Sequence, residues 1–532
     1  MGTSFRAPCV QCGRLWWERG VRRRDDFEMG EMMGAWERSS GVLLHPTSLP
    51  GPDGVGSLGR YARRWIERLA EGGQRWWQVL PLNPPGHGGS PYSASSAFAG
   101  NPMLIDGEQL VEAGWLSGAD LNVYRRVCAA GSTERFDVEV IREAKRELLV
   151  QAFEGWKEAG GVSEASFQEF TKTHAGWLED FALYTALKHR HEGRGWQQWP
   201  APLVRREPEA IAEAQRGLSV AMEQVRFEQW VFAEQWAKLK RYAAERGVGV
   251  LGDVPIFVAM DSAEVWAQRD LFELGADGEP EAVAGVPPDY FSKTGQRWGN
   301  PLYDWERMAE RDYDWWVWRV QQVLRMVDAV RVDHFRGFES YWRIPAEAPT
   351  AVDGRWEKGP GEAVFEAIEA ELGEVPMVAE DLGIITDKVR QLRDDLGLMG
   401  MRVMQFGFDG TEDHPFLPHT YPRHCAAYTG THDNDTTRGW YEGLDELGKH
   451  GVRTYLSHGD EGIVWAMIER LWASKADLVV VPVQDLFELG SEARMNVPGR
   501  AEDNWNWRMS EAMLEDETVY MRLGELTKES KR

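Results

Sequence analysis

The chain has 532 residues, of which 43% are hydrophobic, and this is enough for a large buried core. The formal net charge of −25 argues against nucleic acid and anionic membranes as partners and favours a neutral or cationic ligand. Four cysteines in so long a chain exclude a disulfide scaffold and favour a reducing cytoplasm, and the sequence has no run long and apolar enough to span a membrane.

The first 33 residues form an unusual, arginine-rich segment. It has no apolar run followed by a small-residue cleavage site, so it does not resemble a secretory signal. Cys9 and Cys12 have metal-ligand spacing, but no second Cys or His pair follows nearby, so zinc binding is not expected. Several methionines, the last of them Met33, precede the first regular pattern. We therefore expect residues 1–33 to be a disordered or spurious extension and residues 34–532 to form a single catalytic domain.

Eight short apolar stretches predict strands that alternate with helical segments. Four of them end in carboxylates, namely Asp253, Asp333, Glu380 with Asp381, and Asp433. This pattern predicts an α/β fold, a (β/α)8 TIM barrel with helical and loop insertions at its C-terminal face, where the chemistry of such barrels lies. The stretches are residues 41–46, 76–82, 248–253, 327–333, 377–381, 401–406, 425–435 and 478–485.

Long insertions follow two of the predicted strands. The loop at 83–102 is rich in Gly, Ser and Pro, which suits an active-site loop, although a plain surface crossover has the same composition. Residues 107–246 predict a helical insertion whose apolar stripes indicate core packing and not a cofactor site. Residues 270–305 combine aromatic side chains with amides and glycines. Aromatic rings stack on sugar faces and amides bind hydroxyls, so we expect a sugar-binding loop there.

The stretch from Val327 to Gly337 is the strongest chemical signal in the chain. Arg331 lies two residues before Asp333, on the same face of a strand that should otherwise be apolar. An arginine beside an aspartate keeps the carboxylate ionised and fixes its direction, as a carboxylate nucleophile requires. A structural ion pair at a strand end is an equally good interpretation of these two residues alone.

Several motifs together make the chain resemble the amylomaltases, the bacterial 4-α-glucanotransferases (disproportionating enzymes) of the α-amylase clan. The stretch Trp298-Gly299-Asn300-Pro301 and the run Thr431-His432-Asp433-Asn434 carry the most specific resemblance. The N-terminal extension departs from the family pattern. The full set of matching stretches is residues 44–51, 90–102, 285–301, 331–337, 379–383, 430–436 and 496–499.

The resemblance implies a retaining transfer of α-1,4-glucan segments from a donor maltooligosaccharide to the 4-OH of an acceptor. Such a reaction uses a carboxylate nucleophile and a protonated carboxyl as acid/base, and it passes through a covalent glycosyl-enzyme. Carried over by motif, Asp333 is the nucleophile, Glu380 the acid/base and Asp433 the third carboxylate, which binds sugar hydroxyls. The implied substrate-binding residues are Arg331, His334, His432, Asn434, Asp253, Tyr92, Tyr290, Phe291, Trp298 and Asn300.

Three other functions are compatible with parts of this pattern. An α-amylase-like retaining hydrolase would use the same three carboxylates with water as the acceptor, and it is the main alternative. A non-catalytic glucan-binding protein is disfavoured because all three acidic positions are intact. A metal-dependent hydrolase would need a closer cluster of His and Asp ligands than His432-Asp433 provides. The resemblance implies no organic cofactor and no metal, and the expected partners are maltooligosaccharides and α-1,4-glucans in the cytoplasm.

Overall fold

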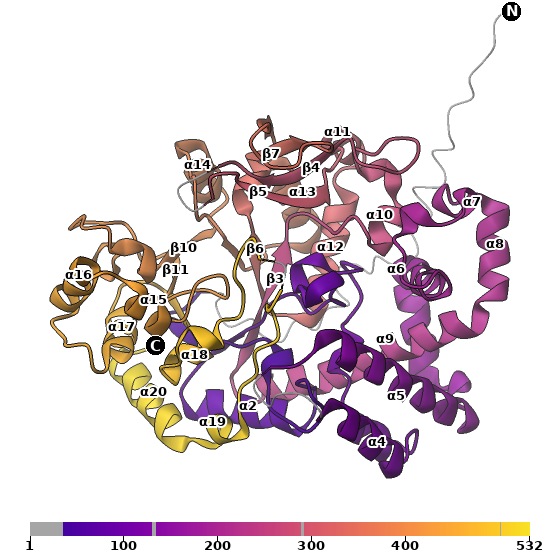
Figure 1. The fold of residues 1–532 in the computed structure, drawn as a ribbon, viewed down its shortest axis with the longest axis horizontal. Coiled ribbons are helices and arrows are strands. Elements are labelled where there is room, and N and C mark those ends of the chain that lie inside the picture. Colours follow the sequence, from indigo (N-terminus) through magenta and orange to yellow (C-terminus); the bar gives the residue numbers. More distant parts are fainter. Residues whose placement is uncertain (1–35, 130–134, 289–291, 501) are drawn as a thin grey trace, which may run out of the picture.

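The computed structural model describes residues 36–129, 135–288, 292–500 and 502–532. Eight parallel strands form a closed barrel in the order β1-β12-β11-β10-β9-β6-β3-β2. Pairing of β1 with β12 closes the ring, with Ser39 opposite Leu478 and Leu43 opposite Pro482. The predicted barrel is thus confirmed (Figure 1). The strands are β1 (Ser39–Leu43), β2 (Trp76–Gln78), β3 (Gly249–Pro255), β6 (Ala329–Asp333), β9 (Met377–Ala379), β10 (Met399–Val403), β11 (Cys425–Tyr428) and β12 (Leu478–Pro482).

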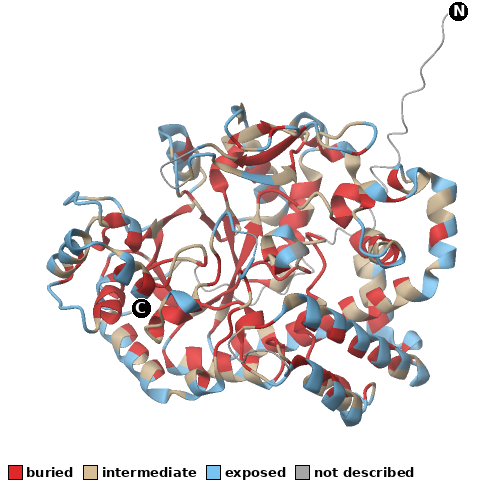
Figure 2. Cartoon of the chain, in the orientation of Figure 1, coloured by how far each residue is buried: buried red, intermediate tan, exposed pale blue. Residues whose placement is uncertain are grey.

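The barrel strands lie at the centre of the molecule and are buried on both faces (Figure 2). Side chains of opposite strands fill the interior, and helices cover the outside, so the strands read as nearly continuous apolar runs. Helices outside the insertion are α2 (Arg60–Glu71), α10 (Ala263–Ala267), α11 (Trp305–Ala309), α12 (Asp314–Met326), α13 (Ala363–Leu372), α14 (Asp387–Asp395), α15 (Thr437–Gly443), α16 (Glu446–Leu456), α17 (Ile463–Trp472), α18 (Val483–Leu486), α19 (Glu511–Glu515) and α20 (Glu517–Glu529).

Between β2 and β3 the chain forms a helical lobe, at the right of Figure 1. Its two longest helices, α6 and α9, pack against each other, and the apolar stripe predicted along α5 is buried, including Leu148 and Trp156. The expectation that these stripes form core is confirmed for the described helices. The lobe consists of α3 (Gly107–Glu112), α4 (Gly118–Cys128), α5 (Val138–Glu158), α6 (Ala165–Arg190), α7 (Ala201–Val204), α8 (Pro208–Gly217) and α9 (Ser219–Ala244).

A four-stranded antiparallel sheet lies above the C-terminal ends of β3 and β6 in Figure 1. It has the order β5-β4-β7-β8 and consists of β4 (Ala282–Val286), β5 (Gln296–Pro301), β7 (Ser340–Pro345) and β8 (Arg355–Lys358). The sequence suggested only a loop over 285–301. Strands form there because β4 pairs with β7, for example Ala284 with Arg343, and this distant partner is invisible in the local pattern.

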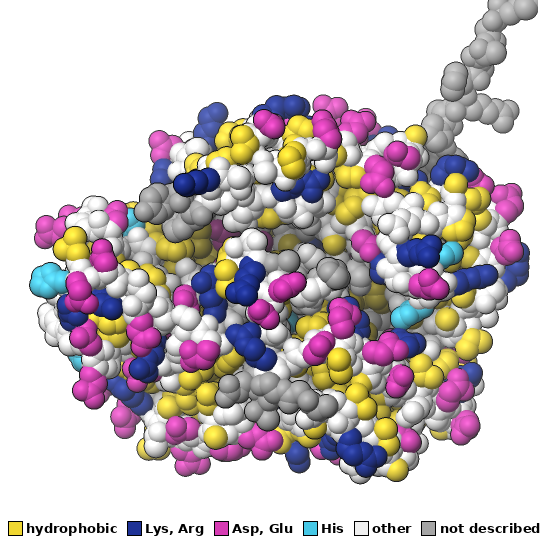
Figure 3. Space-filling view, in the orientation of Figure 1, with side chains coloured by type: hydrophobic (Ala, Val, Ile, Leu, Met, Phe, Trp, Pro, Cys, Tyr) yellow, Lys and Arg dark blue, Asp and Glu magenta, His cyan; other side chains and the backbone are white. Residues whose placement is uncertain are grey.

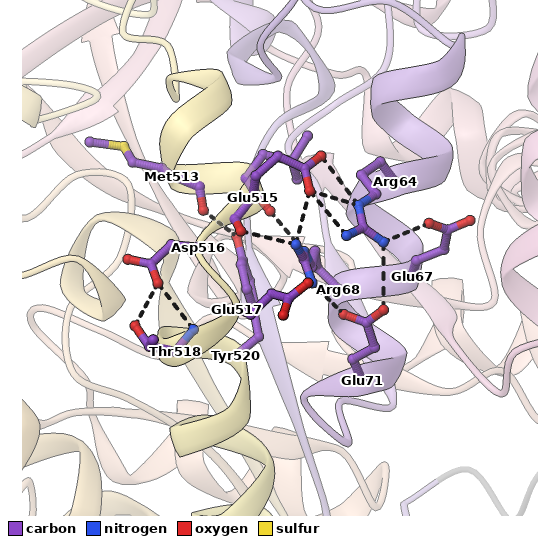
Figure 4. Close-up of polar contacts among 11 residues, drawn as sticks. Arg64, Glu67, Arg68, Glu71, Met513, Glu515, Asp516, Glu517, Thr518 and Tyr520 are labelled. Carbon is purple, nitrogen blue, oxygen red and sulfur yellow. Dashed lines mark hydrogen bonds and ion pairs between the residues drawn. The ribbon is translucent and has the colours of Figure 1, made fainter.

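The C-terminal helices α19 and α20 are fastened to α2 by a network of charged side chains (Figure 4). Arg68 is its buried member, with a side chain only 3% exposed. Its Nε donates to the carbonyl of Leu514 at 2.9 Å, and its Nη2 donates to the carbonyl of Glu515 at 3.1 Å. The last carbonyl groups of a helix have no hydrogen-bond partner within that helix, and Arg68 supplies donors for two of them at the end of α19. None of the described helices is long and apolar enough to cross a membrane.

Candidate active site

Arg331 stands between two carboxylates at the C-terminal ends of adjacent barrel strands. Its Nη1 donates to Oδ2 of Asp253 at 2.7 Å, and its Nη2 donates to Oδ1 of Asp333 at 2.8 Å. The register of β3 on β6 pairs Asp253 with Arg331, which explains why these side chains meet. Burial lowers the pKa of Arg331, but the two carboxylates outweigh it and raise that pKa well above its ordinary value. The guanidinium is therefore permanently charged.

Asp333 is the last residue of β6, and 28% of its side chain stays exposed. Desolvation raises the pKa of Asp333 to about 6, and the neighbouring Asp253 and Asp433 act in the same direction, while Arg331 opposes them. The sequence interpretation, that Arg331 would keep this carboxylate ionised, is correct in direction but incomplete. Arg331 limits the rise and does not abolish it, and at neutral pH Asp333 remains mainly ionised.

Glu380 directly follows β9 and lies beside Asp333. Val332 of β6 pairs with Ala379 of β9, so the residues that follow them, Asp333 and Glu380, are neighbours. Oε2 of Glu380 accepts a hydrogen bond from the backbone N–H of His334 at 2.8 Å, and Oε1 accepts one from Leu382 at 2.8 Å. Burial raises the pKa of Glu380 to about 7, with Arg331 opposing this and Asp333 adding to it. A carboxyl with this pKa holds a proton at neutral pH for part of the time.

Asp433 lies in the loop that follows β11, with 47% of its side chain exposed. Nδ2 of Asn496 donates to Oδ1 of Asp433 at 2.6 Å, and Nη2 of Arg494 donates to the backbone carbonyl of Asp433 at 2.7 Å. No sequence signal gives Asn496 or Arg494 a role of its own. Both belong to an irregular segment after β12. No helical or strand periodicity and no strand end marks a residue there as functional, and only the resemblance over 496–499 points to this segment.

A buried carboxylate anchors the base of the Asp433 loop. Asp485 is 1% exposed and accepts hydrogen bonds from the hydroxyl groups of Thr429 and Thr437, at 2.7 and 2.6 Å, and from the N–H of Thr437 at 2.7 Å. These two threonines bracket the loop, so one side chain fixes both of its ends. Burial raises the pKa of Asp485, while the hydrogen bonds from the two threonines act in the opposite direction.

Aromatic rings surround the carboxylates. Tyr92 donates from its hydroxyl to Oδ2 of Asp253 at 2.8 Å and stacks on His432, with ring centroids 5.1 Å apart and planes 18° apart. Trp505, which no sequence motif marks, contacts both rings. Trp298 is 39% exposed, and its ring lies edge-on to the ring of His334, with the ring centroids 4.9 Å apart. Burial lowers the pKa of His334 to about 3, so this imidazole is neutral at physiological pH.

The two predicted asparagines bind protein groups in this structure. Oδ1 of Asn434 accepts from the N–H and hydroxyl of Thr431, both at 2.9 Å, and Nδ2 of Asn300 donates to the carbonyl of Val258 at 2.9 Å. Both amides therefore stabilise loops around the site. Tyr290 and Phe291 lie outside the described residues.

The face shown in Figure 3 is hollowed beneath the four-stranded sheet, and acidic and basic side chains are interspersed over it. Within the described ranges, no group of three or more His, Cys, Asp or Glu side chains is arranged to hold a metal ion. The geometry thus offers two neighbouring carboxyl groups with raised pKa values, a third carboxylate, and exposed aromatic surface. This combination suits acid/base and nucleophilic chemistry on a sugar.

Comparison with known proteins supports the same conclusion. Residues 44–514 match the family model described as 4-alpha-glucanotransferase. The chain is 50% identical over 481 residues to the 4-alpha-glucanotransferase of Thermus thermophilus, covering 89% of this chain and 95% of that protein. It is 44% identical over 485 residues to the enzyme of the same name from Synechocystis, covering 90% and 95%.

Solved structures agree with these sequence relatives. An amylomaltase from Streptococcus agalactiae in complex with acarbose superposes with a TM-score of 0.90 at 37% identity, covering 93% of this chain and all of that one. The hydrolase alternative is not favoured, because the relatives at this level of identity are transferases. The fold, the extent of the match and the identity to named enzymes together show that the chain belongs to the 4-alpha-glucanotransferase family.

Proposed function

We propose that the enzyme transfers α-1,4-glucan segments between maltooligosaccharides with retention of configuration, and that Asp333, Glu380 and Asp433 carry the reaction. The substrate class follows from the family and from the exposed aromatic surface beside the carboxylates. The buried, free thiols of Cys128 and Cys425 support a location in the reducing cytoplasm.

In the first half-reaction, the Asp333 carboxylate attacks the anomeric carbon of the donor sugar. A bond forms between C1 and the carboxylate, the bond between C1 and the glycosidic oxygen breaks, and Glu380 gives its proton to the departing 4-oxygen. Arg331 binds Oδ1 of Asp333, so we assign the attack to Oδ2. Asp433 would bind hydroxyls of the reacting sugar and favour its distorted ring.

In the second half-reaction, Glu380 acts as the base. It removes the proton from the 4-OH of an acceptor glucan, whose oxygen attacks C1 and releases Asp333. A sugar acceptor prevails over water if aromatic surface binds the acceptor and displaces solvent. Trp298, beside His334, is positioned to provide such surface.

One observation carries the proposal. The N–H next to the proposed nucleophile donates to the proposed acid/base, so one backbone position links the two reacting groups. Burial raises the pKa of both groups, and Arg331 donates directly to Asp333, which favours the ionised form there and leaves Glu380 as the group that carries the proton.

The test is incubation with pure maltotriose. We expect a ladder of longer maltooligosaccharides together with glucose, and no ladder with Asp333→Asn. If glucose and maltose form without longer products, water is the acceptor and the transferase proposal is wrong.

A second comparison isolates the role of Glu380. An α-maltosyl fluoride donor has a leaving group that needs no proton, so Glu380→Gln should form the glycosyl-enzyme much faster from the fluoride than from maltotriose. Asp333→Asn should be inactive with both donors. Equal losses with the two donors in Glu380→Gln would contradict the acid role.

A further inference from the structure

Arg336 is a buried arginine close to the proposed nucleophile. It lies in the short 3-10 helix η9 (Phe335–Phe338), three residues after Asp333, and is only 4% exposed. Arginine is seldom buried to this degree unless its donors are used. The reaction outlined above assigns Arg336 no role.

The guanidinium of Arg336 contacts the start of β7 and two segments further along the chain. Its Nη1 donates to the carbonyl of Ile384, and its Nη2 donates to the hydroxyl of Ser340 at 3.1 Å. The guanidinium also lies over the ring of Trp356, 3.6 Å from the ring centroid. Ser340 is in turn held by donating to Glu339 at 2.6 Å. A planar fork with several donors suits such bridging, and a lysine could not reproduce it.

Ile384 belongs to the segment that carries the proposed acid/base. This segment, residues 380–386, is irregular between β9 and α14. On its β10 side it is held by Asp381, which accepts from the N–H of Met401 at 2.7 Å. At its start, the N–H of Phe335 donates to the carbonyl of Glu380 at 3.1 Å. Near its end, Arg336 binds Ile384. Adjacent residues of η9 therefore hold the Glu380 segment at two points, four residues apart.

Two attachments to one rigid element define the position of the segment better than one does. Losing the Ile384 attachment would leave Glu380 tied to the β6 side only through the backbone hydrogen bonds at its own position. Proton transfer to a glycosidic oxygen is sensitive to such a loss, because displacements of about 1 Å can reduce rates about 100-fold. Attack by Asp333, which is held separately by Arg331, is less sensitive.

We propose that Arg336 is a positioning residue, which fixes the Glu380 segment relative to Asp333 through its hydrogen bond to Ile384 and is itself held by Ser340 and the ring of Trp356. This inference rests on the proposed function, since it assumes that Glu380 is the acid/base.

The test compares two donors in an Arg336→Met variant. Methionine keeps an apolar chain against Trp356 but has no donor for Ile384. We expect kcat with maltotriose to fall about 10- to 100-fold with KM changed less than about threefold, and activity with α-maltosyl fluoride to fall much less. Arg336→Lys should recover only part of the loss, and added guanidinium should raise the maltotriose activity of Arg336→Ala.

Arg390→Met provides the matched control. Arg390 lies on α14, directly after the same segment, but its side chain is 52% exposed and pairs only with Asp387 among the described residues. This control should retain wild-type activity with both donors. Folding of each variant is checked by its melting temperature, and Arg336→Lys replaces Arg336→Met if the latter does not fold.

The outcomes separate the two proposals. A near wild-type kcat in Arg336→Met, or equal losses with both donors, would overturn the positioning role. Glu380→Gln is measured in parallel. If it shows no difference between the donors, the acid/base assignment fails first, and the role of Arg336 falls with it.

Discussion

The backbone N–H of His334 donates to Oε2 of Glu380 at 2.8 Å, and His334 is the residue immediately after Asp333. His334 has a φ of 50°, in the left-handed region that residues with side chains rarely adopt. This conformation turns the chain directly after the nucleophile, so that its N–H faces the neighbouring strand end. The strained residue therefore sets the two carboxyl groups side by side, as strained residues at functional sites often do.

The pH dependence of the reaction should be bell-shaped. Transfer from maltotriose requires an ionised Asp333, whose pKa is raised to about 6, and a protonated Glu380, whose pKa is raised to about 7. We expect kcat/KM to fall as the pH drops below the first value, since Asp333 gains a proton, and to fall as the pH rises above the second, since Glu380 loses one. Initial rates between pH 4.5 and 9 measure both the acidic limb and the basic limb of this pH profile.

The assignment of the basic limb can be checked with the fluoride donor. This donor needs no proton from Glu380, so both the wild type and Glu380→Gln should keep the acidic limb, which belongs to Asp333, and show no basic limb in the formation of the glycosyl-enzyme. A basic limb that persists in this variant would belong to another group.

Asn496 should be required for the correct position of Asp433. In Asn496→Ala the short hydrogen bond to Oδ1 of Asp433 is lost. A hydrogen bond to a charged group contributes about 1.5–3 kcal/mol, so kcat with maltotriose should fall about 10- to 100-fold. Ser491→Ala is the control. It removes a bond to Asp435, two residues further along the same loop, and should change kcat less than about threefold. Equal effects of the two variants would show that the loop responds as a unit.

Glu264 should make stability depend on pH. It is 4% exposed and accepts a hydrogen bond from Ser96 at 2.6 Å, and burial raises the pKa of Glu264 to about 7. The folded state therefore binds a proton that the unfolded state releases at lower pH. This stabilisation is complete below the unfolded pKa and is lost as the pH rises through about 7.

Glu264→Gln removes this dependence. At pH 8 the variant should gain about 1–3 kcal/mol in the free energy of unfolding, whereas at pH 4 it should gain nothing. Denaturant unfolding at the two pH values measures the difference, with the exposed Glu112→Gln as control. A variant that is equally stable relative to wild type at both pH values would mean that Glu264 does not titrate in the folded state.

Arg68 should stabilise the packing of the C-terminal helices on α2. Arg68→Met leaves the carbonyls of Leu514 and Glu515 without this donor, which should cost about 2–3 kcal/mol in the free energy of unfolding. Arg64 lies in the same network but is 29% exposed and binds only side chains, so Arg64→Met should cost less than about 1 kcal/mol (Figure 4). Similar melting temperatures for the two variants would contradict this distinction.

The sequence predicts the barrel well because each strand carries its own local signal. An apolar run that ends in Asp253, Asp333 or Glu380 identifies both a buried strand and the end that faces the site. The strands β4 and β5 have no such signal. Residues 296–301 include Gln, Arg and Asn, and they pair with the preceding strand β4, whose other partner, β7, lies far along the chain.

The site was predictable to a similar extent. Residues next to a strand end could be identified, but the partners of Asp433 could not, because Asn496 reaches it from an irregular segment 63 positions away. The network of Asp485 with Thr429 and Thr437 was missed for the same reason, although Asp485 itself ends a predicted strand. The role of Arg336 depends on a carbonyl acceptor, which no residue type reveals.

The closure of the barrel by β1 and β12 has a consequence for folding. A polypeptide emerging from the ribosome has β1 and β2 early but cannot complete the ring until β12 has been made. One edge of β1 (Ser39–Leu43) therefore stays unpaired until then. Contacts between such distant parts of the chain form slowly. Pairing of β6 with β9 sets the register of Asp333 and Glu380, but the loop of Asp433 is held by Asp485, Arg494 and Asn496, which follow β12 in the chain. Catalytic competence should therefore appear only when β12 and the residues that follow it are in place.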